Sequence, residues 1–106
     1  MATANRLEIL RTMLQNNPAD TFARYGLAME LANSGNLEEA VREYRALLEQ
    51  NPNYAAAYYH GGQALEKLAL LEEARELYEK GIEVTSRSGD LKTRNELQAA
   101  IDLLPL

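Results

Sequence analysis

The sequence predicts an all-α fold built from repeated helix–turn–helix units, with about six helices in all. The strongest indication is an internal repeat. The motif Leu-Glu-Glu-Ala-x-x-x-Tyr at residues 37–44 occurs again at residues 71–78, a spacing of 34 residues. Aligning residues 17–50 with residues 51–84 gives eleven identical pairs, including an Asn-Pro near the start of each copy. A period of this length is typical of arrays of paired helices.

Apolar spacing and turn residues divide the chain into its expected helices. Leu7, Leu10, Met13 and Leu14 share one helical face, and the Asn-Pro at 17–18 ends that helix. The expected helices cover residues 4–16, 20–33, 37–50, 54–67, 71–84 and 91–104. The residues expected to cap them at the amino end are Asp20, Asn36 (in a capping box with Glu39), Asn53 and Asp90.

The boundary between the fourth and fifth expected helices depends on the repeat. Residues 67–71 contain no helix breaker, so this part of the chain alone would predict one long helix. The first copy has the turn Asn-Ser-Gly-Asn at 33–36, and the alignment therefore predicts a turn at 67–70, with Ala69 in place of Gly35. Residues 86–90, Ser-Arg-Ser-Gly-Asp, are expected to form a loop. This loop shifts the last helix to an offset of 39 from the helix at 54–67.

Composition excludes several classes of function. The net charge is −5, so the chain lacks the basic surface that nucleic acids or anionic membranes require. There is no cysteine, which excludes disulfides and thiolate metal sites. Residues 1–6 lack the apolar run of a signal peptide, and no apolar stretch is long enough to cross a bilayer. We therefore expect a cytoplasmic protein.

Residues 17–84 resemble the tetratricopeptide repeat (TPR) family. That family has small residues at unit positions 8 and 20, an aromatic residue at 24 and proline at 32. The matching residues are Ala28, Ala40, Tyr44 and Pro52 in the first copy, and Gly62, Ala74 and Tyr78 in the second. The chain departs from the family at Arg24, where tryptophan is usual, at Gly61 and Gly81, which replace larger residues, and at Ser86, which replaces the closing proline. The resemblance implies a right-handed α-α superhelix.

The expected organisation is a single domain over residues 1–106. Its parts are an N-terminal half-repeat helix at 4–16, repeat one at 17–50, repeat two at 51–84, and a C-terminal capping helix at 90–104. About three units are needed to bury a continuous core. The N-terminal half-unit, the two full units and the C-terminal half-unit add up to three units, which predicts a complete folding unit.

The resemblance also implies a binding groove on the concave face, where unit positions 2, 5, 6, 9 and 13 point. The residues at those positions are Phe22, Tyr25, Met29, Asn33, Tyr59, His60, Gln63 and Lys67. Exposed aromatic and methionine side chains are typical of a protein-binding surface. The alternative is that the last helix folds over these residues and buries them. Family members that clamp a C-terminal carboxylate have lysine and asparagine at two positions where this chain has Tyr25 and Met29.

No constellation of catalytic or metal-binding residues is present. His60 is the only histidine, and no second imidazole or thiolate could complete a metal site with it. The glutamate pairs at 38–39 and 72–73 lie in the first turns of their helices, where negative charge interacts favourably with the helix dipole. We expect no enzyme activity, no cofactor and no metal.

The function predicted is a protein-interaction module that binds a peptide or helical segment of a partner protein. Lys67, Arg94 and Arg24 are the candidate cations of its binding face, so a neutral or mildly acidic partner is expected. The alternative is a structural scaffold that self-associates as a homodimer through its terminal helices. The expected contacts would be the face of Leu7, Leu10 and Leu14 and the face of Leu97, Ile101 and Leu104.

Overall fold

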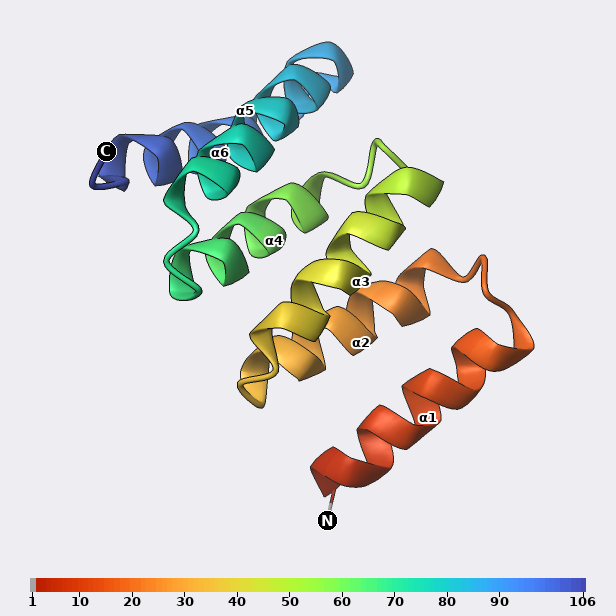
Figure 1. Cartoon of the computed structure of the whole chain (residues 1–106). Coiled ribbons are helices and arrows are strands. Elements are labelled where there is room, and N and C mark those ends of the chain that lie inside the picture. Colours follow the sequence, from red (N-terminus) through yellow and green to blue (C-terminus); the bar gives the residue numbers. More distant parts are fainter. Residues whose placement is uncertain (1) are drawn as a thin grey trace.

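The computed structural model describes residues 2–106, and it describes side chains from Arg6 onward. This part of the chain contains six helices and no strand. The helices are α1 (Ala2–Asn16), α2 (Thr21–Asn33), α3 (Leu37–Gln50), α4 (Ala55–Lys67), α5 (Leu71–Ser88) and α6 (Leu91–Leu103). Figure 1 shows them stacked in chain order, with the two termini at opposite ends of the stack.

The helices form two layers. Each helix packs against the next one in sequence, and in addition α4 contacts both α2 and α6. Among the described residues, α1, α3 and α5 make no such contacts with one another. Successive elements of a curved stack approach most closely on its inner side. The layer of α2, α4 and α6 is therefore the concave one, and α1, α3 and α5 form the convex layer (Figure 1).

Close packing within each unit depends on small residues facing tyrosine rings. Ala40 and Ala74 are fully buried, and Tyr44 and Tyr78 are buried in the core as their positions in the repeat predict. A Cβ atom on Gly62 would lie 2.1 Å from Cε1 of Tyr78, and one on Gly81 would lie 2.6 Å from Cβ of Tyr58. The glycines of the second unit are thus the reason that its helices approach closely.

The turn predicted at 67–70 is confirmed. Helix α4 ends at Lys67 and α5 begins at Leu71. Ala69 has φ = 62°, the left-handed conformation that Gly35 adopts in the first unit with φ = 87°. In both turns a backbone N–H three residues beyond the helix end bonds back across the last turn, from Asn36 to Leu31 and from Leu70 to Leu65.

The loop expected at 86–90 is wrong at its start, because α5 continues to Ser88. Val84 and Thr85 are buried, and the hydroxyl of Thr85 donates to the carbonyl of Gly81 at 2.8 Å. Helix α5, which also packs against α6, therefore extends past the end of the 34-residue unit. Gly89, with φ = 78°, ends it.

Two of the four predicted caps are confirmed. The carboxylate of Asp20 accepts a hydrogen bond from the backbone N–H of Ala23 at 3.0 Å. The carboxylate of Asp90 accepts one from Thr93 at 3.1 Å, and hydrogen bonding from Thr93 lowers the pKa of Asp90. Asn36 occupies the N-cap position of α3 as predicted, but its side chain makes no capping bond. The prediction of Asn53 is wrong, because the residue before α4 is Tyr54.

Candidate functional site

A row of aromatic rings crosses the concave layer. The ring of Tyr25 on α2 lies 5.1 Å from that of Tyr54 and 6.0 Å from that of His60 on α4. His60 lies 5.3 Å from Tyr59 in an edge-to-face arrangement. All four rings are half-buried, so each packs against its neighbours and keeps an accessible part. The sequence placed Tyr25, Tyr59 and His60 on this face, and it missed Tyr54.

Five of the predicted groove residues surround one cavity between α2 and α4. It has a volume of about 210 Å³. Its lining consists of Met29, Ala32, Asn33, Leu37, Tyr44, His60, Gln63, Ala64 and Lys67. The floor is apolar, while Asn33 and Lys67 are exposed at the edge. The cavity can therefore take an apolar side chain beside a hydrogen-bonding or acidic group.

A second cavity lies between α4 and α6. It has a volume of about 280 Å³ and is lined by Tyr59, Gln63, Glu66, Glu96, Ala99, Ala100 and Leu103. Gln63 lines both cavities, and its amide donates to the hydroxyl of Tyr59 at 2.9 Å. The two cavities are thus neighbours on one face.

Burial shifts the pKa of both Tyr25 and His60 on this face. Burial raises the pKa of Tyr25, and the nearby Tyr54 raises it further. Burial lowers the pKa of His60, an effect that the negative charge of Glu96 partly opposes. The phenol of Tyr25 is therefore neutral at pH 7, and the His60 ring favours its neutral form.

Phe22 stands apart from the other predicted residues. Its side chain is 75 % exposed at the start of α2 and lines neither of the two concave cavities. It could contact only a partner that extends beyond the row of rings.

Helix α6 borders the groove and does not cover it. Glu96, Ala99 and Leu103 line the second cavity, and Leu103 remains 82 % exposed. The alternative in which the last helix buries the predicted residues is therefore wrong. Sequence reasoning missed these α6 residues, although the offset of 39 already aligned Ala99 with His60.

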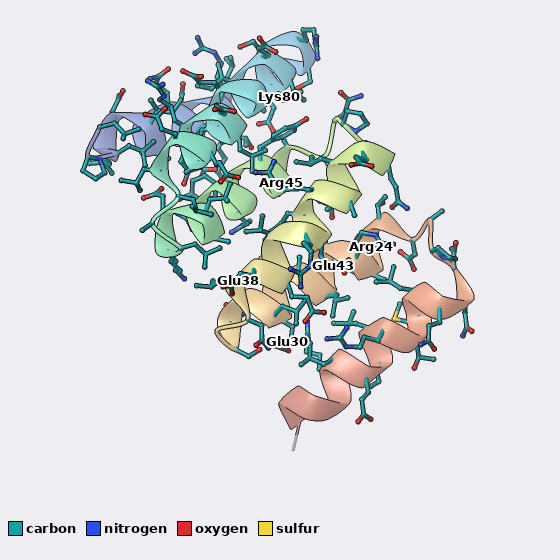
Figure 2. The ribbon with its side chains drawn as sticks, in the orientation of Figure 1. Arg24, Glu30, Glu38, Glu43, Arg45 and Lys80 are labelled. Carbon is teal, nitrogen blue, oxygen red and sulfur yellow. The ribbon has the colours of Figure 1, made fainter. Side chains whose placement is uncertain are left out.

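Two of the three expected cations, Arg24 and Arg94, do not line the groove. Arg24 points into the contact between α2 and α3 (Figure 2), where it pairs with Glu43 at 2.6 Å and donates to the carbonyl of Pro18. Arg94 donates to the hydroxyl of Ser86 at 3.0 Å, at the end of α5. Only Lys67 lines a concave cavity.

The faces proposed for self-association are turned inward. Leu7 and Leu10 pack against the core and Leu14 is buried. On α6, Leu97 and Leu104 are buried and Ile101 packs against the core. What α1 does expose includes Ile9, which is 59 % exposed, and Met13, which is 39 % exposed. The prediction that Met13 shares the inward face of Leu7, Leu10 and Leu14 is therefore wrong.

The described residues contain no group of three or more His, Asp or Glu side chains placed to hold a metal ion. Within this same part of the chain, no helix has the length and apolar character needed to cross a membrane.

The model of the tetratricopeptide repeat family matches residues 25–89. The chain belongs to the tetratricopeptide repeat family. The expected fold class, an all-α superhelix of helix–turn–helix repeats, is therefore confirmed. A TPR repeat-containing protein of Pseudomonas aeruginosa is 28 % identical over 91 residues, which cover 86 % of this chain and 87 % of that protein.

Solved structures of TPR proteins share the fold. A tetratricopeptide repeat domain protein from Salinibacter ruber is 38 % identical with a TM-score of 0.72, over 77 % of this chain and 91 % of that one. YrrB, described as a TPR protein with an unusual peptide-binding site, is 31 % identical with a TM-score of 0.81, over 92 % of this chain and 47 % of YrrB. The TPR2B domain of yeast Sti1, solved in a complex with pHsp70, has a TM-score of 0.87 at 18 % identity, over 94 % of this chain and 80 % of that one, which shows a common fold alone.

Proposed function

We propose that this protein is a non-enzymatic interaction module that binds a peptide or helical segment of a partner protein on its concave face. The observation that carries the proposal is the continuous surface made by the half-buried aromatic row and the two cavities beside it. The proposed contact residues are Phe22, Tyr25, Met29, Asn33, Tyr59, His60, Gln63 and Lys67. A cytoplasmic location is part of the same proposal.

The chemistry of this face suits a polypeptide. Rigid aromatic side chains offer large contact areas at low entropic cost, and they are enriched among the residues that dominate binding energy. The amides of Asn33 and Gln63 can bond a backbone in either orientation. YrrB, a TPR protein with an unusual peptide-binding site, has the same fold at 31 % identity, which supports this use of the fold.

The proposal is tested by selecting binders to the full chain from a displayed library of random peptides and measuring their Kd. Replacing Asn33 by Arg and Lys67 by Glu alters two exposed side chains at the cavity edge, so the fold should be kept. We expect this variant to lose at least about tenfold in affinity, in line with the loss of well-placed polar contacts. A second variant, Tyr25→Ala with Tyr59→Ala, should abolish binding, although its melting temperature will fall because both rings pack against the core.

The matched control is Ile9→Ala with Met13→Ala, on the far side of α1. It should leave peptide affinity unchanged. If the control abolishes binding and the cavity variants do not, the concave face is not the site. Light scattering on the wild-type chain tests the scaffold alternative, because self-association through the terminal helices requires a dimer whose share rises with concentration.

A further inference from the structure

The two cavities of the concave face carry opposite charges. Lys67 lines the cavity between α2 and α4, and Glu66 and Glu96 line the cavity between α4 and α6. None of these three side chains forms an ion pair with another described residue. The second cavity therefore holds two uncompensated carboxylates.

Glu66 on α4 and Glu96 on α6 line the same cavity from two separate helices. Glu66 accepts a hydrogen bond from the buried hydroxyl of Tyr78, which fixes its orientation. Glu96 comes from α6, and its charge acts on His60 across the groove. Glu66 is half-buried, whereas Glu96 remains exposed to solvent.

The rest of the lining is apolar or aromatic. Ala99, Ala100 and Leu103 form one wall, and the ring of Tyr59 forms another. Such walls suit the aliphatic stem of a lysine or arginine side chain, whose charged end then meets the carboxylates. A ring beside the cation adds attraction through its electron-rich face. The cavity of about 280 Å³ is open at its edge, so a long side chain can enter from a bound segment.

We propose that the cavity between α4 and α6 is a subsite for a lysine or arginine side chain of the partner. This inference rests on the proposed function, because the cation is carried by the segment that occupies the concave face. It also determines where the residues of that segment lie, with its basic residue at α6 and an acidic or neutral polar residue near Lys67. The expectation of a neutral or mildly acidic partner, made from the sequence, is replaced by that of a partner with a basic residue at a defined place.

The test uses the peptides selected on the full wild-type chain. They should share a lysine or arginine at one position, and replacing that residue by norleucine or glutamine should weaken binding. The variant Glu66→Gln with Glu96→Gln keeps an acceptor for Tyr78 and should raise the Kd of such a peptide about tenfold, the combined loss of two partly exposed charge pairs. The matched control, Glu76→Gln with Glu79→Gln, removes the same charge from exposed positions of α5 and should change the Kd less than twofold.

Charge reversal gives the sharper result. Glu96→Lys should lose the basic peptide, and a peptide with glutamate in place of the basic residue should recover binding to that variant. The cationic subsite is wrong if the selected peptides bind through the cavity between α2 and α4 but show no preference for a basic residue. It is also wrong if the double glutamine variant and its control have equal effects on the Kd. In either case the proposal that the groove binds a peptide is unaffected. If no peptide is enriched on the wild-type chain, the proposed function fails and the subsite fails with it.

Discussion

The two repeat units reach the same helix packing with different interiors. In the first unit the contact between α2 and α3 contains the ion pair of Arg24 and Glu43, whose side chains are only 16 % and 20 % exposed (Figure 2). The residues 34 positions later are Tyr58 and Leu77, which are apolar or aromatic. A third position differs between the units together with these two: it is Leu47 in the first unit and Gly81 in the second.

This difference shows that the repeat determines which positions contact each other but not which residue types occupy them. The ion pair requires both of its partners, because either charge alone would be left largely buried. The tyrosine of the second unit requires a glycine opposite it, because Cβ of Tyr58 occupies the space of a side chain at Gly81. Each unit is therefore sensitive to a different kind of substitution.

The largest expected effect is in the first unit. Glu43→Leu leaves the Arg24 guanidinium without its carboxylate, and since its Nε already lacks a partner, the free energy of unfolding should fall by about 3 kcal/mol. The double variant Arg24→Met with Glu43→Leu should restore most of this, because an apolar pair replaces a largely buried ion pair at little cost. Pro18 would keep its bond from Gln50. Equilibrium unfolding in urea measures both, and equal losses in the single and double variants would contradict the comparison.

A smaller effect is expected from the glycines of the second unit. Gly81→Ala places a methyl group 2.6 Å from Cβ of Tyr58 and 2.8 Å from Cδ1 of Leu97, so we expect a loss of about 2 kcal/mol from overpacking. The control is Gly26→Ala, whose new methyl group would meet only the movable end of Leu10 at 3.2 Å. Helix propensity should make that variant neutral or slightly stabilising. Melting temperatures that fall equally for the two would show that Gly81 has no special packing role.

The smallest effect concerns the turns. Ala69 holds a left-handed conformation that costs an alanine about 1 kcal/mol, so Ala69→Gly should stabilise the protein by up to that amount. Gly35→Ala makes the reverse change in the first unit and should destabilise it by a similar amount. Calorimetry of the two variants should show melting temperatures shifted in opposite directions. Shifts of the same sign would mean that the turns are not equivalent.

The 34-residue period predicted the turn at 67–70, where no local signal exists, and apolar spacing with turn residues predicted the helices outside the two copies. Helix ends were less predictable, because α5 extends to Ser88 with Val84 and Thr85 buried, a feature that the period does not encode. Asn36 has the right type for a cap, yet backbone bonds complete that turn without its side chain.

The concave positions followed from the repeat and its family, and the charges within the groove did not. Arg24 was expected to face the groove, and it lies between α2 and α3 instead. The signal that could have shown this is the paired change of Arg24 and Glu43 to Tyr58 and Leu77 across the two copies. The acidic cavity was missed because Glu66 and Glu96 come from helices separated by α5, and only the packing of α6 on α4 brings them together.

The central claim is that the concave layer binds the partner, and it is tested most directly by mapping a bound peptide on the protein by NMR. A peptide selected on the full chain is titrated into the ¹⁵N-labelled protein, and backbone amide shifts are followed. We predict that the large shifts fall on α2, α4 and α6 around Tyr25, His60, Gln63 and Glu96. Large shifts confined to α3 and α5, or to the outer side of α1 around Ile9 and Met13, would contradict the account.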